Sequence, residues 1–220
     1  MTTFRSLDLE SIANALANHQ PGILKPNKRG HAAVTMLLRE SSPAPEVLFI
    51  IRAAHDQDPW SGNIAFPGGR LNQETESPRQ AAERETLEEL ALDLGQARYL
   101  GRLSDLYGAT LPVMVSCFVY QLLEPATFQP NHEVATTFWS PLTKLLEPER
   151  QHQRTFFYRG EERTHPVVEL LDTHQPLLWG ITYRLMRNFF ELCGLDFGSP
   201  EPTDAIAATL PHSDSAIIFR

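Results

Sequence analysis

The stretch that decides the fold is residues 66–89, which read FPGGRLNQETESPRQAAERETLEE. Its second half carries a helix start, because Ser77 can act as the N-cap, Pro78 suits the first helical position and Gln80 completes a capping box. We therefore predict a helix over residues 78–92. The glycines of the Pro-Gly-Gly turn before it would let the backbone approach a metal or phosphate closely, since glycine has no Cβ, and their carbonyls are potential ligands.

Three glutamates share one face of this predicted helix. At about 100° per residue, Glu85, Glu88 and Glu89 fall within an arc of roughly 100°. On an isolated helix each pair repels by about 0.2–0.5 kcal/mol, a cost that any helix tolerates. A hard divalent cation such as Mg²⁺ binds oxygen ligands of this kind together with substrate phosphates. The glutamate pattern alone fits both a metal site and an ordinary solvated helix face.

The residues around these glutamates favour the metal site. Arg84 precedes Glu88 by four residues and can pair with a carboxylate. The glycine turn and Glu76 stand at a short, fixed separation from the helix face, and this combination indicates a functional site. On the opposite side of the helix, Leu87, Leu90 and Leu94 are expected to face the core, with Glu83 among them as the residue that does not fit.

Strand-like runs outnumber helical ones elsewhere in the chain and do not alternate regularly with them. Predicted strands cover residues 31–38, 46–51, 97–104, 114–123 and 134–140, with a hairpin at 154–171. Predicted helices cover 6–18, 78–92, 141–146 and 179–193, and residues 54–69 are expected to form a loop. This order favours an α/β (α+β) sandwich with a mixed β-sheet over a doubly wound parallel sheet.

The length of 220 residues, with 42% hydrophobic and 21% charged residues, suits one globular domain with extensions. We expect an N-terminal helix and connector over 1–30, one domain over 31–194 and a tail over 195–220. A net charge of −8 without a Lys/Arg block argues against nucleic-acid binding. Without a long apolar run or an apolar leader, no membrane partner is expected and a cytoplasmic location is predicted. The oligomeric state stays open, with room for a homodimer.

The cysteines and histidines offer no metal site of their own. Cys117 and Cys193 lie in apolar runs, which predicts buried core residues rather than a disulfide or a thiolate site. The eight histidines share no metal-ligand spacing such as H-x3-H. Carboxylates are therefore the side chains that we expect to hold a metal.

The decisive stretch resembles the Nudix box, G-x5-E-x7-R-E-U-x-E-E-x-G-U, in which U is a bulky apolar residue. The residues that match in type and spacing are Glu76, Arg84, Glu85, Glu88 and Glu89. The chain departs from the box at three points. Gly69 lies one residue too far from the first glutamate, Thr86 stands at an apolar position, and Ala91 replaces the later glycine.

The likeness extends outward to the coenzyme A pyrophosphatases within the Nudix family. Similar motifs occur at residues 48–53, 62–69, 131–134, 138–142 and 179–183. That branch has a second arginine midway between Arg52 and Gly62, where this chain holds Gln57 and Asp58. The resemblance implies a Nudix-type α/β/α sandwich and leaves the identity of the substrate open.

The resemblance also implies an activity and a set of roles. The implied activity is hydrolysis of a pyrophosphate linkage with the help of Mg²⁺ or Mn²⁺. The implied small-molecule partner is a nucleoside diphosphate joined to another group, such as coenzyme A or a related nucleotide. The implied metal ligands are Glu85, Glu89, Glu88 and the Gly69 carbonyl, the implied phosphate contacts are Arg52, Arg70 and Gly68, and Glu76 braces Arg84. The general base is a box glutamate or Glu133. Local capping by Glu133, and a surface salt bridge for Arg52, are near-equal alternatives.

Two other functions fit the same fold. An isomerase of prenyl diphosphates would need an additional Cys or Glu acid/base pair in an apolar pocket, and neither cysteine lies in a suitable loop. A non-catalytic nucleotide-binding module would tend to lose box carboxylates and to carry a DNA-binding region. Here every box carboxylate is present, and residues 1–30 are too few for a winged helix.

Overall fold

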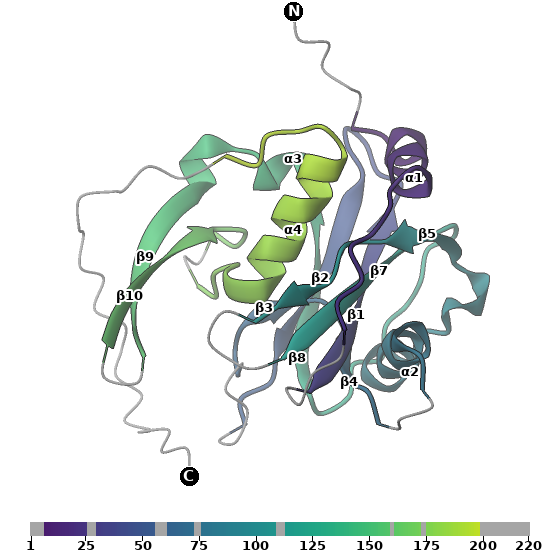
Figure 1. The fold of residues 1–220 in the computed structure, drawn as a ribbon, viewed down its shortest axis with the longest axis horizontal. Helices are drawn as coiled ribbons and strands as arrows, with labels where there is room; N and C mark the ends of the chain where they lie inside the picture. Colours follow the sequence, from purple (N-terminus) through teal and green to yellow (C-terminus); the bar gives the residue numbers. More distant parts are fainter. Residues whose placement is uncertain are drawn as a thin grey trace, which may run out of the picture.

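A computed structural model describes residues 7–25, 30–55, 61–72, 76–108, 113–158, 161–172 and 175–198 (Figure 1). The strands are β1 (His31–Arg39), β2 (Glu46–Arg52), β3 (Ile64–Ala65), β4 (Gly68–Arg70), β5 (Arg98–Arg102), β6 (Leu106–Tyr107), β7 (Met114–Leu122), β8 (Val134–Pro141), β9 (Gln151–Tyr158) and β10 (Glu161–Val168). The helices are α1 (Leu9–Ala17), α2 (Pro78–Leu90), α3 (Leu142–Leu145) and α4 (Gly180–Leu192), with short 3-10 turns η1 (Leu94–Gln96) and η2 (Pro148–Arg150).

Eight strands form one mixed sheet, and β9 and β10 form a separate antiparallel hairpin. The central strand β1 runs parallel to β7, and the other pairings in the sheet are antiparallel. On its other side β1 has two neighbours: β2 pairs near one end, at Leu38, and β4 pairs near the other, at Ala32 to Val34. This division leaves room for the glycine turn beside the centre of the sheet.

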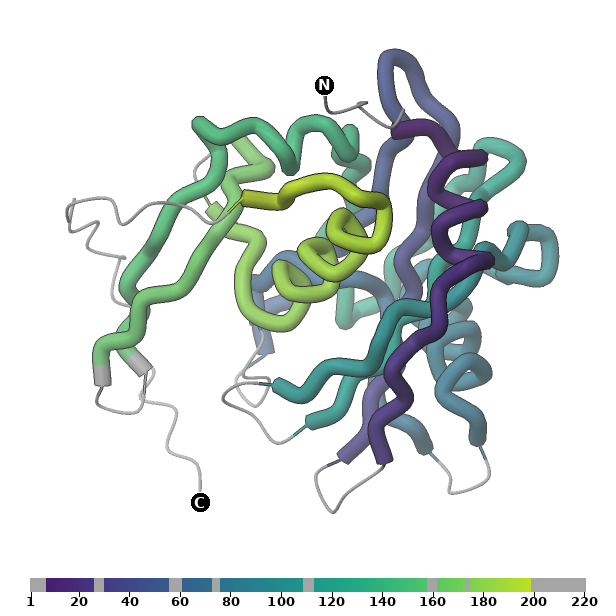
Figure 2. The backbone as a smooth tube through the Cα atoms, turned by 45° about the horizontal axis from the view of Figure 1, so that its top comes forward, coloured from purple at the N-terminus to yellow at the C-terminus, as the bar shows by residue number. Residues whose placement is uncertain are grey.

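Two hydrophobic cores lie on opposite faces of the sheet. Successive residues alternate between them, so that Met36 and Leu38 of β1 pack with α1 and α4, whereas Leu37 packs with α2. Because both faces are covered, β1, β2 and β7 are nearly continuous apolar runs. Figure 2 shows α4 and α2 on either side of the sheet. The predicted α/β/α sandwich with a mixed sheet is confirmed.

Helix α2 begins as predicted and ends two residues early. The capping box is complete, since the Ser77 side chain accepts from the Gln80 backbone N–H and the Gln80 side chain accepts from the Ser77 backbone N–H. The helix stops at Ala91, which adopts a left-handed conformation with φ of 54°. This is the position of the missing box glycine, which would adopt such a φ at lower cost.

The expected core face of α2 was wrong at Leu87, which is 51% exposed. The buried residues of the helix are Ala81, Ala82, Thr86, Glu89 and Leu90. Small alanines bring this side of the helix against β1, and the Thr86 hydroxyl lies 2.9 Å from that of Thr35. Glu83, which did not fit the expected pattern, bonds to the Tyr120 hydroxyl and to Arg79.

The predicted loop over residues 54–69 is also partly wrong, because β3 and the start of β4 fall within it. These strands are two and three residues long, too short for a periodic pattern, and they form only because β2 and β1 offer free edges. Gln57 and Asp58 lie outside the described residues, as do residues 199–220 of the expected tail.

The remaining predicted elements appear with shifts of a few residues at their ends, including α1, α4 and the β9–β10 hairpin. Cys117 and Cys193 are buried, as expected. Among the described helices, none has both the length and the apolar character to cross a membrane. The domain boundaries proposed from the sequence stay predictions.

Candidate active site

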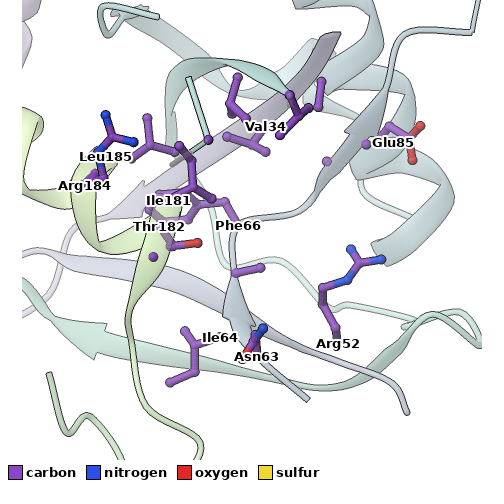
Figure 3. Close-up of a pocket in the computed structure, with 18 of the residues that line it drawn as sticks. Val34, Arg52, Asn63, Ile64, Phe66, Glu85, Ile181, Thr182, Arg184 and Leu185 are labelled. Carbon is purple, nitrogen blue, oxygen red and sulfur yellow. The ribbon is translucent and has the colours of Figure 1, made fainter. Parts of the chain in front are cut away.

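A cavity of about 590 Å³ is lined by α2, β4, the first turns of α4 and neighbouring strands (Figure 3). One end carries charged side chains from the decisive stretch, including Glu85, Glu88 and Arg84. The other end is lined mainly by apolar side chains such as Ile181 and Leu185. The cavity therefore joins a charged end and an apolar end in one continuous space.

Glu89 is the buried carboxylate at the charged end, with 1% of its surface exposed. Its Oε2 accepts a hydrogen bond of 2.8 Å from the Gly68 backbone N–H. Its Oε1 has no hydrogen-bond partner and lies 3.9 Å from Nη1 of Arg52. Burial raises the pKa of Glu89 to about 8, although the Gly68 N–H and the Arg52 charge act in the opposite direction. A buried carboxylate oxygen without a partner is costly, and a bound cation would compensate for it.

Arg84 ties together the other carboxylates of the stretch. Its Nε lies 2.8 Å from Glu76, and its Nη1 lies 2.8 Å from Glu85 and 3.2 Å from Glu88. Its Nη2 donates to the Arg70 carbonyl. The hydrogen bonds from Arg84 and the Asn72 backbone lower the pKa of Glu76, whereas burial raises the pKa of Glu85. One guanidinium pairs with three carboxylates, so the charged end of the cavity keeps an excess of negative charge.

The two glycines of β4 are required by close contacts. Gly68 has φ of 147°, and a Cβ there would lie 2.3 Å from the Ala33 carbonyl oxygen. A Cβ on Gly69 would lie 2.4 Å from the carboxyl carbon of Glu85. Both contacts are impossible for any other residue without a shift, so these glycines let β4 fit between β1 and α2. A metal-ligand role for the Gly69 carbonyl stays a prediction.

The loop that carries Glu133 is held against the same end of the cavity. Its carbonyl accepts from Ala53 N–H at 2.8 Å, and Asn131 N–H donates to the Glu89 carbonyl at 2.9 Å. The Glu133 N–H is bonded to the Asn131 side chain at 2.8 Å, so the local capping is done by Asn131. The Glu133 carboxylate is 48% exposed, lines the cavity, and raises the pKa of both Glu85 and Glu89 by its charge.

The structure brings the residues expected from the resemblance to one end of the cavity, but their carboxylates are not grouped around a single point. Arg52 and Arg70 line the cavity at its charged end, Arg52 facing buried Glu89 and Arg70 exposed at the end of β4. Within the described ranges, no three His, Cys, Asp or Glu side chains are grouped so that they could hold a metal ion. Arg84 bonds to both Glu85 and Glu88, whereas the Glu89 carboxylate is turned toward Gly68. These contacts keep the Glu89 carboxylate apart from those of Glu85 and Glu88.

No role was predicted from the sequence for the residues that line the α4 side of the cavity. Trp179 donates its indole N–H to the Asn63 side chain at 2.9 Å and stacks on Phe156 with ring centroids 4.4 Å apart. Arg184 lies on α4 between Ile181 and Leu185, and all three line the cavity. The signal that could have revealed them is a charged residue within an apolar helix face at three- and four-residue spacing.

Comparison with known proteins identifies the family. Residues 29–159 match the family model described as the NUDIX domain. An uncharacterized protein of Schizosaccharomyces pombe is 32% identical over 169 residues, covering 66% of this chain and 51% of that protein. The mitochondrial coenzyme A diphosphatase NUDT8 of Homo sapiens is 30% identical over 156 residues, covering 69% of this chain and 64% of that protein. The matches thus span about half to two thirds of the length of these relatives.

A solved structure supports the fold. The MutT/nudix family protein from Enterococcus faecalis aligns with a TM-score of 0.50 at 16% identity, covering 84% of this chain and 68% of that chain. Helix α4 lies beyond the end of the family-model match, so the part of the apolar wall that α4 supplies, including Ile181 and Leu185, lies outside it. Glu85 and Glu88 of the decisive stretch line one end of the cavity. Because the family model covers more than half of the sequence, the chain belongs to the Nudix hydrolase family.

Proposed function

We propose that this protein is a divalent-metal-dependent hydrolase that cleaves the pyrophosphate of a nucleoside diphosphate joined to a second group, with coenzyme A or a related nucleotide as substrate. The observation that carries the proposal is the buried Glu89 carboxylate, whose Oε1 has no hydrogen-bond partner beside a cavity with further glutamates. The human relative is a coenzyme A diphosphatase, which supports the substrate class.

The donor set fits Mg²⁺ or Mn²⁺, which prefer carboxylate and carbonyl oxygens. Glu85, Glu88 and Glu89, with the Gly69 carbonyl, are the groups that would hold such an ion. A pyrophosphate would be repelled by these carboxylates in the absence of a cation, because Arg84 compensates only part of their charge. When bound, the cation supplies charge neutralisation at the phosphates and lowers the pKa of a water molecule.

The chain's own residues position the reactants. Glu76 and Arg84 brace Glu85 and Glu88, while the Gly68 N–H orients the carboxylate of Glu89. Arg52 and Arg70 are placed to contact phosphate oxygens at the same end of the cavity. Glu133 or a box glutamate accepts the proton of the attacking water, and both candidates are retained.

The cavity supports a substrate with an apolar portion. Its volume of about 590 Å³ is that of an ordinary small-molecule site. Beyond the charged end, the wall includes Phe66, Ile181 and Leu185, which offer no hydrogen bonds to a sugar's hydroxyls. An apolar portion of the substrate would bury surface against this wall.

The proposal is tested by measuring phosphate release with Mg²⁺ or Mn²⁺ from coenzyme A, ADP-ribose, nucleotide sugars, dinucleoside polyphosphates and nucleoside triphosphates. Glu89→Gln should lower turnover by about two to four orders of magnitude with folding retained. The matched control is Glu83→Gln, which removes the same charge from the same helix but at a carboxylate that contacts Arg79 and Tyr120. Near wild-type activity of Glu89→Gln would contradict the proposal.

Thermal stabilisation by a nucleotide without any phosphate release would favour the non-catalytic alternative. The cytoplasmic location and the homodimer stay predictions. Cell fractionation checks the location, and sedimentation of the purified chain checks the assembly.

A further inference from the structure

We propose that Arg184 of α4 binds a second anionic group of the substrate, a phosphate group that lies beyond the pyrophosphate to be cleaved. The inference rests on the proposed function, because it assigns the far end of the same cavity. It names a residue that decides which substrates are preferred.

Arg184 lies far from the carboxylates within one cavity. Figure 3 shows Arg184 on the α4 side of the cavity and Glu85 on the opposite side, with Phe66 and Ile181 between them. A substrate whose pyrophosphate lies at the carboxylates would extend along the apolar wall toward Arg184. The pyrophosphate itself is therefore not the anion that this guanidinium is placed to bind.

The other arginines that line the cavity differ from Arg184 in their surroundings. Arg84 is shared among three carboxylates, and Arg52 faces the buried Glu89. Arg70 follows the glycine turn, and its carbonyl is bonded to Arg84, so it belongs to the charged end. In the part of the chain that the structure describes, Arg184 has no carboxylate within ion-pair distance. No carboxylate of the described residues thus compensates its positive charge.

The guanidinium of Arg184 is held in place by the backbone. Its Nη1 donates to the Tyr107 carbonyl of β6 at 2.5 Å. Within the described residues its other donors, on Nε and Nη2, bond to no protein group. A guanidinium with its orientation set and donors remaining suits the planar, charge-assisted recognition of phosphate.

The neighbours of Arg184 strengthen such a contact. Ile181 and Leu185, three residues before and one residue after it, line the same wall and reduce the local exposure to water. Electrostatic interactions gain strength as water is excluded. A hydrogen bond to a charged group in this setting corresponds to a preference of about 10- to 100-fold.

The test uses substrate pairs that differ by a single phosphate, namely coenzyme A with 3′-dephospho-coenzyme A, and NADPH with NADH. The two pairs place the phosphate at different ribose positions and so distinguish its source. For at least one pair, kcat/KM of the wild-type protein should be about 10- to 100-fold higher for the phosphorylated member. Arg184→Gln should reduce this preference to less than about threefold, mainly through KM, while activity on the other member is retained.

The matched control is Arg187→Gln, on the same helix but outside the cavity, where the guanidinium pairs with Glu191. This control should keep the wild-type preference. Arg184→Lys keeps the charge but not the planar fork, so it should retain part of the preference. A wild-type protein without preference in either pair, or an Arg184→Gln variant that keeps the preference, would overturn the proposal.

Binding in the absence of metal separates this proposal from the proposed function. Adenosine 3′,5′-bisphosphate and adenosine 2′,5′-bisphosphate are each titrated against adenosine 5′-monophosphate by calorimetry, with no hydrolysis required. At least one bisphosphate should bind more tightly to the wild type, and that advantage should be lost in Arg184→Gln. If Arg184→Gln removes the affinity advantage of a bisphosphate but the wild type cleaves no pyrophosphate, the proposed function fails and the Arg184 site stands. If cleavage occurs but neither bisphosphate gains affinity, the Arg184 site fails alone.

Discussion

The two ends of the cavity are built in opposite ways. At the charged end, residues 66–89 supply the turn, the helix and the glutamates from one contiguous stretch, and each contact is close and specific. The apolar end joins parts of the chain that are far apart in sequence, such as Tyr107 of β6 and Arg184 of α4. The charged end carries the residues that match the Nudix box, and we expect the apolar end to distinguish substrates.

This difference explains why a short motif identifies the reaction but not the substrate. Glutamates three and four residues apart on one helix are placed by local geometry. The α4 wall lies outside the family-model match and reaches the cavity only through packing. The following experiments separate the two ends, and the largest expected effect comes first.

The strongest contrast is between one glycine at each end. Gly69→Ala should lower kcat/KM by about 100-fold or more, because its Cβ would displace the Glu85 carboxylate. Gly180→Ala should change activity only a few-fold and cost about 1 kcal/mol of stability, because its φ of 65° is strained for alanine but nothing lies within 4 Å of its Cβ. Kinetics and thermal unfolding of both variants check this. An equal loss of activity in the two would remove the distinction between the ends.

The buried charge at Glu89 should cost stability when no metal is present. Its pKa is raised from 4.5 to about 8 in the folded protein, so folding becomes less favourable as pH rises through this window, and the loss is complete above it. Glu89→Gln should therefore stabilise the metal-free protein by about 2 kcal/mol at pH 9, after the cost of one unpaired amide group. At pH 4 the two proteins should be equally stable or the variant weaker.

The measurement is urea unfolding in EDTA at both pH values. Added Mg²⁺ should stabilise the wild type and not the variant, because the metal binds the ionised carboxylate. A wild type that is more stable than Glu89→Gln at pH 9 without metal would contradict the raised pKa.

The threonine pair beneath α2 should have a smaller effect, confined to stability. Thr86→Val removes hydroxyl contacts to Thr35 at 2.9 Å and to the Ala82 carbonyl at 2.7 Å, at a cost of about 1 kcal/mol. Thr35→Val should cost a similar amount, and the double variant less than the sum, since the two hydroxyls share one contact. Denaturant unfolding of the four proteins checks this, and strict additivity would show that the pair is not coupled.

The smallest effect is expected at Trp179. Trp179→Leu should raise KM about fivefold for a substrate that fills the cavity, with kcat nearly unchanged, because the indole forms part of the wall and bonds to Asn63 rather than to a box glutamate. The variant should hydrolyse a small substrate, such as a nucleoside triphosphate, with the same kcat and KM as the wild type. A fall in kcat for both substrates would instead place Trp179 within the reacting end.

The sequence by itself determined α2, its capping box and the spacing of its glutamates, because these depend on residues a few positions apart. For the glycine turn it predicted a close approach to a metal or phosphate, whereas the close neighbours in the structure are Ala33 and Glu85. Only the tertiary structure decided which side of α2 is buried. The helical pattern placed Leu87 in the core, but packing against β1 buries Thr86 and Glu89 instead.

The short strands β3 and β4 were likewise decided by tertiary structure, since two or three residues carry no period and depend on an edge offered by another strand. The same holds for the surroundings of Arg184. Its position on α4 could be read from the sequence, but its bond to Tyr107, 77 residues away in sequence, follows from the way α4 packs on the sheet. Local spacing therefore determined the end to which we assign the reaction, and long-range packing determined the end to which we assign the rest of the substrate.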